Sequence, residues 1–170
     1  MKREFSSGGV VFKKLRVESG ELRIFWLVTK SRPSEPYPKE VWRLPKGWLD
    51  DKDNGPGLLA RGERKAKEEE LQKAALREVR EEAGIDAKII DKIGTERYFS
   101  TVSAEKILKF VTFYLMEWKS NLPEGPGWET ENVDWLLFEI ARKKLSYPGE
   151  KKVLDKASII LEQGIQTSLV

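Results

Sequence analysis

The sequence predicts an α/β protein in which helices cover a mixed β-sheet. Runs of β-branched and aromatic residues recur between turn-forming residues along the chain, which is typical of β-strands. One stretch instead repeats apolar residues at every fourth position, which is typical of an amphipathic helix. Because strands dominate and 170 residues can bury one core, we expect a single layered domain over residues 1–170.

The first part of the chain predicts a β-hairpin, a short strand and a long polar segment. The expected elements are strands over 5–13 and 22–29 with a turn at Ser19-Gly20, a proline-rich loop over 31–38, a short strand over 41–44 and an exposed loop over 47–70. The last segment is mostly charged or turn-forming, so we expect no more than a short surface helix within it.

An amphipathic helix is expected over 71–83. Its apolar stripe recurs every four residues from Leu71 to Ala83, and Gly84 follows where a left-handed glycine ends many helices. The remaining expected elements are strands over 89–99, 107–118 and 134–138, a loop over 122–128 and a closing amphipathic helix over 151–161.

The composition limits the chemistry that a site can use. The chain has no cysteine and no histidine, which excludes thiol nucleophiles, disulfides, Cys/His zinc sites and Ser-His-Asp triads. Its 28 acidic residues favour carboxylate chemistry instead. The net charge of +3 gives no strong indication of nucleic-acid binding, and no apolar run is long enough for a membrane span or a signal peptide. We therefore expect a soluble cytoplasmic protein with no membrane partner.

The segment Arg77–Ile85 carries the strongest functional signal. On a helix, Glu78, Glu81 and Glu82 stand at i, i+3 and i+4 and therefore share one face. Such a cluster suits a hard divalent cation, because Mg²⁺ and Mn²⁺ prefer oxygen ligands. A solvated, salt-bridged helix face is the alternative interpretation of the same residues.

Several features of this region resemble the Nudix hydrolases. Residues 77–85 match the family pattern Arg-Glu-apolar-x-Glu-Glu-x-Gly-apolar at every specified position, and Glu69 precedes them at the family's spacing. Gly47 matches the family's glycine, but sixteen additional residues separate it from Glu69, which places an insertion at about 51–67 before the helix. The resemblance extends through Trp42–Gly47 and the later strands, and it implies a Nudix-type α/β/α sandwich with a mixed β-sheet.

The resemblance also implies a magnesium- or manganese-dependent pyrophosphohydrolase. We expect Glu78 and Glu82 to be the principal metal ligands and to be essential for catalysis, with Glu81 as a further ligand. Arg77 can pair with Glu81 at i+4 and orient it. The residues expected to support this site are Gly47, Glu69 and Gly84.

Two acids need a separate argument. Glu129 lies six residues before Trp135, a spacing similar to that in diadenosine tetraphosphate hydrolases, which makes it the candidate for an extra metal ligand or the general base. Glu131 is the alternative, and an ordinary loop glutamate is the simpler interpretation. On an unbroken helix, nine residues at about 100° each would place Glu69 opposite Glu78, so we expect Glu69 to join the site, in a supporting role, only from the preceding loop. The alternative is that Glu69 is merely one acid of the run Glu68-Glu69-Glu70.

The substrate signals favour dinucleoside polyphosphates. Pro45-Lys46-Gly47 and the segment 145–154 resemble the diadenosine polyphosphate hydrolase subgroup. The candidate substrate-binding residues are the cations Arg43, Lys46 and Lys109 for phosphates and the aromatic residues Tyr98 and Tyr147 for a nucleobase. Solvation or core packing is the alternative for each of these five.

We therefore expect metal-dependent hydrolysis of a diphosphate linkage in a nucleoside polyphosphate, with diadenosine tetraphosphate as the leading substrate. The enzymatic alternatives are removal of pyrophosphate from RNA 5′ ends, which the near-neutral charge does not favour, and hydrolysis of nucleoside-diphosphate sugars or inositol pyrophosphates. A non-catalytic Nudix-fold binding module is the alternative from another class, but it predicts a broken acid cluster and this one is intact. The sequence leaves the oligomeric state and the role of the insertion open.

Overall fold

The computed structural model describes residues 1–34 and 39–168, together with their side chains as far as residue 165. Residues 35–38 of the expected proline-rich loop lie outside the described part of the chain. The elements, in chain order, are β1 (Lys2–Arg16), β2 (Leu22–Ser31), β3 (Val41–Arg43), β4 (Lys46–Trp48), β5 (Asp51–Lys52), β6 (Gly55–Pro56), α1 (Glu68–Ala83), β7 (Ile85–Val102), β8 (Glu105–Asn121), β9 (Thr130–Leu136), α2 (Phe138–Lys144) and α3 (Pro148–Ser168).

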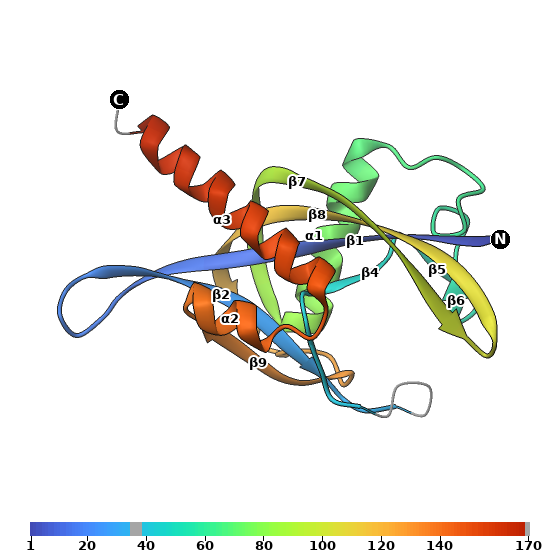
Figure 1. Ribbon diagram of the computed structural model, residues 1–170, viewed down its shortest axis with the longest axis horizontal. Coiled ribbons are helices and arrows are strands. Elements are labelled where there is room, and N and C mark those ends of the chain that lie inside the picture. Colours follow the sequence, from blue (N-terminus) through green and yellow to red (C-terminus); the bar gives the residue numbers. More distant parts are fainter. Residues whose placement is uncertain (35–38, 169–170) are drawn as a thin grey trace.

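A mixed sheet forms the centre of the molecule (Figure 1). Its strands follow the order β3-β2-β1-β8-β7, while β4 pairs with β1 and β9 pairs with β2. β1 and β8 run parallel, with Val10 opposite Leu115, and the other pairs are antiparallel. The expectation of a mixed sheet is therefore confirmed.

Helices cover both faces of this sheet. Along β1, Val10 and Phe12 belong to a cluster with residues of α3, whereas Val11 belongs to a second cluster with Ala75 and Val79 of α1. Successive side chains of a strand point to opposite faces, so one run of apolar residues fills both layers. The α/β/α sandwich is thus confirmed. Among the described residues, no helix combines the length and apolarity needed to cross a membrane.

The helix carrying the acid cluster begins earlier than its apolar pattern indicates. α1 starts at Glu68 rather than near residue 71, and three acids occupy its first turn. Acidic side chains favour this end because unpaired N–H groups make it positive. The Glu70 carboxylate accepts a hydrogen bond from the Lys67 backbone N–H at 3.0 Å and holds Arg64 as a fork at 3.0 and 2.7 Å. Charge and capping therefore form the turn that apolar periodicity does not reveal.

The inserted segment 51–67 is folded onto the body of the protein. Most of it is exposed as expected, but Ala60 is completely buried. The Asp50 carboxylate accepts hydrogen bonds from the backbone N–H groups of Leu59 and Ala60 at 3.0 and 2.8 Å, and the Ala60 carbonyl accepts one from Phe5 N–H at 2.8 Å. The segment is thus an exposed loop for the most part, as expected, and one carboxylate closes it on itself.

Two element boundaries near the end of the chain also differ from the prediction. The expected strand over 134–138 is shifted to β9, and Phe138 begins the short helix α2 instead. α3 begins at Pro148, before the expected residue 151, since proline is suited to the first turn of a helix. In each case the apolar pattern does not mark the terminal residues, so the boundary is displaced by a few positions.

The end of α1 is fixed to the loop between β8 and β9. Gly84 adopts φ 67°, and its carbonyl accepts a hydrogen bond from Leu122 N–H at 2.8 Å. Gly127 N–H donates to the Glu81 carbonyl at 2.7 Å. A Cβ on Gly84 would lie 2.3 Å from the backbone carbon of Gly125. Glycine at this position therefore serves both the left-handed cap and the close approach of the loop.

This double role predicts the cost of a side chain at residue 84. Gly84→Ala is expected to lower the free energy of unfolding by about 3 kcal/mol, of which about 1–2 kcal/mol is the left-handed conformation. Gly20→Ala is the matched control, because Gly20 also has positive φ (85°) but nothing within 4 Å of an added Cβ. Urea unfolding of both variants measures the difference. Equal losses would show that the contact with Gly125 has no energetic consequence.

Candidate active site

Two acids of α1 are buried against the sheet. Glu78 and Glu82 are only 8% and 7% exposed, whereas the Glu81 side chain is 61% exposed. A Cβ on Gly47 would lie 2.2 Å from the carboxyl carbon of Glu78, so the glycine of β4 leaves the space that this carboxylate occupies. The i, i+4 pair therefore faces β4, while Glu81 turns outward to solvent.

Glu82 links α1 to the segment that joins β3 and β4. Its two carboxylate oxygens accept hydrogen bonds from Arg43 Nη2 and from the Lys46 backbone N–H, each at 3.0 Å. Burial raises the pKa of Glu82 to about 7, the neighbouring Glu78 adds to the rise, and Arg43 opposes it. Burial by itself would lower the pKa of Arg43. The charges of the Glu82 and Glu150 carboxylates have the larger effect, so the pKa of Arg43 is raised.

Glu78 is held by a different arginine. Arg77 Nη2 donates to Glu78 at 3.1 Å and to the Trp48 carbonyl at 2.6 Å. The expected ion pair of Arg77 with Glu81 is present at 3.8 Å, so it is looser than these two contacts. Burial raises the pKa of Glu78, Arg77 opposes the rise, and the charge of Glu81 contributes to it.

The pair Glu78 and Glu82 fits a hard divalent cation. Both are buried oxygen donors: burial raises the pKa of each, and neighbouring carboxylates add to the rise, Glu81 at Glu78 and Glu78 at Glu82. A cation bound by the pair would therefore relieve an existing electrostatic cost. Mg²⁺ commonly takes one or two carboxylates and completes its shell with water and substrate phosphate. Within residues 1–34 and 39–168, no three Asp or Glu side chains are placed to enclose a metal ion by themselves. The donor set therefore matches a site that is completed by substrate.

The remaining predicted acids lie at different distances from this pair. Glu129, exposed on the loop before β9, is near enough for its charge to raise the pKa of Glu82. Glu131, the alternative, instead pairs with Lys30 at 3.4 Å. Glu69 is exposed in the first turn of α1, nine residues before Glu78. The expectation that Glu69 enters the site from the loop is therefore wrong, because the helix already includes it and turns it away.

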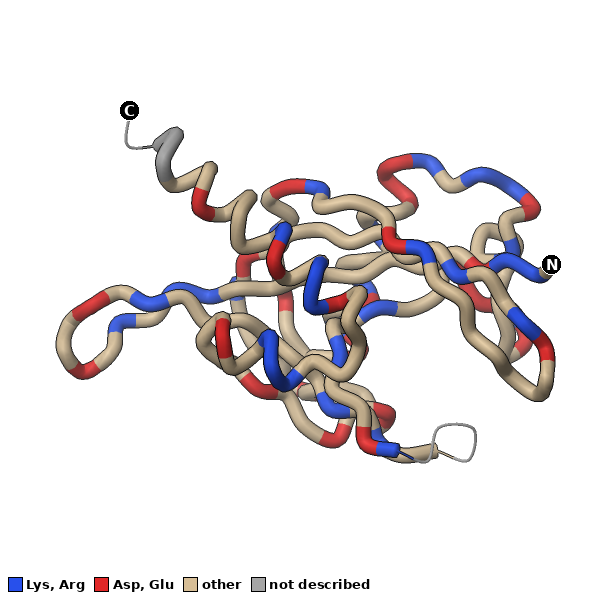
Figure 2. Tube along the Cα trace, viewed as in Figure 1, with Lys and Arg blue, Asp and Glu red and all other residues tan. Residues whose placement is uncertain are grey.

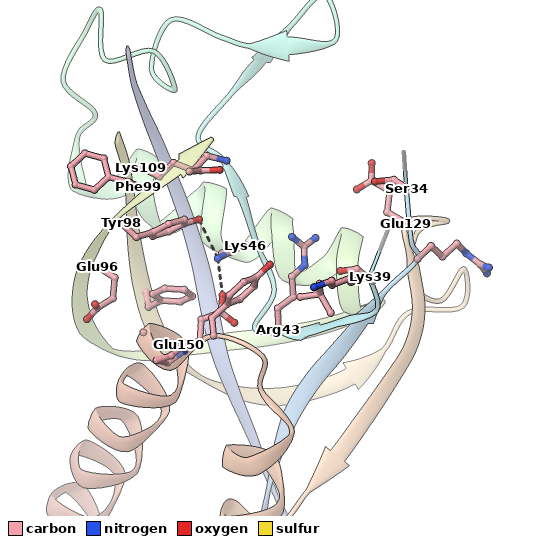
Figure 3. A pocket seen from close by; sticks show the side chains of 18 of the residues that line it. Ser34, Lys39, Arg43, Lys46, Glu96, Tyr98, Phe99, Lys109, Glu129 and Glu150 are labelled. Carbon is pink, nitrogen blue, oxygen red and sulfur yellow. Dashed lines mark hydrogen bonds and ion pairs between the residues drawn. The ribbon is translucent and has the colours of Figure 1, made fainter. Parts of the chain in front are cut away.

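A pocket of about 780 Å³ opens beside the acid pair. All five predicted substrate-binding residues and Glu129 line it: Arg43, Lys46, Tyr98, Lys109, Tyr147 and Glu129. Figure 3 shows Tyr98 and Lys109 on one side, Glu129 on the other, and Arg43 and Lys46 between them. Glu78 and Glu82 do not line the pocket themselves, and Arg43 connects its wall to Glu82.

Glu150 is the principal site residue that the sequence interpretation missed. It is buried, pairs with Lys46 Nζ at 2.7 Å and accepts a hydrogen bond from Leu44 N–H at 2.7 Å. Burial would lower the pKa of Lys46, but Glu150 and Tyr98 outweigh this and raise it. The only feature of Glu150 that the sequence could reveal is its place in the first turn of a helix, where acidic residues are common.

The pairing changes the expected role of Lys46. Its ammonium donates to Tyr98 OH at 3.3 Å and lies 5.0 and 5.5 Å from the ring centroids of Tyr98 and Tyr147. The lysine therefore holds two aromatic walls together, and its charge is balanced by Glu150. Lys109 is similarly paired with the buried Glu4, at 3.6 Å.

Fold and site together define a class: an α/β/α protein with a buried pair of helix carboxylates beside a pocket of aromatic and basic residues. A family model described as the NUDIX domain matches residues 11–157. The chain belongs to the Nudix hydrolase family.

Similar proteins fall within the same family. The Ap4A hydrolase of Caenorhabditis elegans in a binary complex is 24% identical, with a TM-score of 0.62 over 94% of this chain and 98% of that one. The NUDIX domain of NrtR from Shewanella oneidensis, solved with ADP-ribose, is 13% identical, with a TM-score of 0.61 over 95% and 90%. A putative mutator protein, MutT4, of Mycobacterium tuberculosis is 24% identical over 123 residues, which are 72% of this chain and 43% of the relative. The chain thus matches less than half of that relative's length.

Burial of Glu82 predicts how stability depends on pH. A carboxyl pKa raised from 4.5 to about 7 means that the folded state retains the proton more strongly than the unfolded state. Without added metal, the contribution of Glu82 to the free energy of unfolding should therefore fall by about 3 kcal/mol as the pH rises from 4.5 to 7. Glu82→Gln should remove this fall.

Urea unfolding in EDTA, between pH 5 and 8, measures the difference between wild type and Glu82→Gln. Glu69→Gln is the matched control, since this exposed glutamate of the same helix should leave the pH dependence as it is in the wild type. A constant difference between wild type and Glu82→Gln across the range would contradict the raised pKa.

Proposed function

We propose that the protein is a divalent-cation-dependent pyrophosphohydrolase of nucleoside polyphosphates, with a dinucleoside polyphosphate such as diadenosine tetraphosphate as its leading substrate. The observation that carries the proposal is the buried pair Glu78 and Glu82 beside a pocket with both cationic and aromatic walls. The name of the C. elegans relative, an Ap4A hydrolase, agrees with this substrate class.

Glu78 and Glu82 would hold the cation, with Glu81 and Glu129 as further donors. When bound, a Mg²⁺ or Mn²⁺ ion supplies positive charge that offsets the phosphate oxygens and polarises water. Glu78 is kept in place by Arg77, which also holds the carbonyl of Trp48 in β4. Arg77 thus fastens the helix that carries the principal proposed ligands to β4.

Arg43 is the proposed phosphate-binding residue. It lines the pocket, and its Nη2 donates to Glu82. Its Nε is buried and has no hydrogen-bond partner within the described part of the chain. An unpaired buried N–H is costly, and a phosphate oxygen is a strong acceptor for it. Arg43 would therefore bind the phosphate chain next to the acid pair.

Glu129 and the two tyrosines complete the proposed machinery. Glu129 lies across the pocket from Tyr98 (Figure 3) and is exposed, so it can accept the proton of an attacking water. Tyr98 and Tyr147, which flank Lys46, offer ring faces to a nucleobase. Gly47 supports the site because its lack of a side chain leaves space for the Glu78 carboxylate. Gly84 supports it by ending α1 with a left-handed cap.

Nucleoside-diphosphate sugars form the second candidate class, since the similar NUDIX domain of NrtR was solved with ADP-ribose. A triphosphorylated RNA end would be favoured by a continuous basic surface. Along the trace in Figure 2, Lys and Arg are instead interspersed with Asp and Glu. This distribution favours a small nucleotide.

Removing either buried carboxylate should abolish most of the activity. Glu78→Gln and Glu82→Gln are each expected to lower kcat at least about a hundredfold in saturating Mg²⁺, because each would delete one proposed metal ligand. Glu69→Gln should stay within about twofold, because that side chain faces away. Release of ATP from diadenosine tetraphosphate measures all three. Wild-type protein without turnover of any diphosphate would refute the proposed enzyme.

A substrate panel distinguishes the candidate classes. We expect kcat/KM for diadenosine tetraphosphate to exceed that for ADP-ribose and for triphosphorylated RNA by at least about tenfold, a margin that corresponds to one further aromatic or phosphate contact. The same Mg²⁺ concentration serves for all three. A preference for ADP-ribose would overturn the choice of substrate while leaving the reaction class in place.

A further inference from the structure

An exposed aromatic residue of the pocket wall lies directly beside the proposed general base. Trp128 lines the pocket directly before Glu129, and its side chain is 79% exposed. A large apolar side chain left open to water inside a pocket indicates a contact with ligand. We infer that Trp128 stacks on the second nucleobase of a dinucleoside polyphosphate, an inference that rests on the proposed function.

The backbone around Trp128 is anchored on both sides. Arg32 Nε donates to the Trp128 carbonyl at 2.7 Å, and the Arg32 backbone N–H donates to the Glu129 carbonyl at 2.9 Å. On the preceding side, Gly127 N–H donates to the Glu81 carbonyl of α1 at 2.7 Å. The indole is therefore carried by a loop fixed to the residue that follows β2 and to the helix of the acid pair. A platform held in this way needs little ordering when a base stacks on it.

The position of this platform matches a substrate with two bases. Glu129, the chain neighbour of Trp128, lies on the opposite side of the pocket from Tyr98 and Phe99, with Arg43 and Lys46 between them (Figure 3). A phosphate chain bound at Arg43 would thus have an aromatic wall at each end. A mononucleotide can use one wall, whereas a dinucleoside polyphosphate can use both.

Stacking on Trp128 also predicts low specificity for the identity of the second base. Every nucleobase presents a ring face to an indole, and stacking is worth about 1–3 kcal/mol per base without reading its hydrogen-bonding edge. Trp128 would therefore distinguish a substrate with two bases from a substrate with one. It would not distinguish adenine from guanine at that end.

The test compares Trp128→Ala, Trp128→Phe and wild type on diadenosine tetraphosphate and on adenosine 5′-tetraphosphate, which lacks the second nucleoside. Trp128→Ala should raise KM for diadenosine tetraphosphate about tenfold, and the preference for the dinucleotide over the mononucleotide should fall by the same factor. Trp128→Phe keeps a ring and should restore most of the preference. Ile140→Ala, at an exposed apolar residue of α2, is the control for loss of surface side chains.

Two outcomes would overturn the inference. If Trp128→Ala changed KM for both nucleotides by the same factor, or for neither, the second base would not contact the indole. In that case wild-type turnover would still support the proposed function. Wild-type protein that hydrolysed neither nucleotide would refute the proposed function and the inference with it. Thermal unfolding of each variant separates these results from a loss of folded protein.

Discussion

The structure around the site depends on one buried carboxylate, that of Glu82. It joins α1 to the chain between β3 and β4 through Arg43 and the Lys46 backbone N–H, each at 3.0 Å. Burying a carboxylate is favourable only where donors replace its water, and here one donor is charged and the other belongs to the backbone. Because both lie on the segment that also carries Gly47, this contact fixes the distance between the acid helix and the pocket wall.

A second set of contacts fixes the opposite wall of the pocket, on the β8–β9 loop, relative to α1. The Glu81 and Gly84 carbonyls, at the end of α1, accept hydrogen bonds from the β8–β9 loop at 2.7 and 2.8 Å. The same loop carries Trp128 and Glu129 into the pocket. One helix thus sets both the proposed metal ligands and the loop facing them. A substitution at the helix end can therefore alter the pocket without touching a proposed ligand.

The sequence was sufficient for features that repeat or that obey local rules. The run of β-branched and aromatic residues in β1 predicted a strand, the four-residue stripe of α1 predicted a helix, and Gly84 predicted where that helix ends. Contacts between distant residues were not accessible in this way. Glu150 contacts Lys46 across 104 positions of the chain, and the Asp50 carboxylate closes the insertion through backbone N–H groups, which every residue except proline possesses. Neither contact has a periodic or compositional signature.

The electrostatics of the site give a reason for pairing each acid with an arginine. Burial raises the pKa of both carboxylates, and the repulsion of neighbouring acids adds to the rise, from Glu81 at Glu78 and from Glu78 at Glu82. Arg77 neutralises Glu78 and also donates to the Trp48 carbonyl. Arg43 neutralises Glu82 and also lines the pocket. The metal-free site can thus fold without a cation. Because the repulsion is only partly offset, the carboxylates retain a driving force to bind one, and Arg43 then becomes available to a phosphate oxygen.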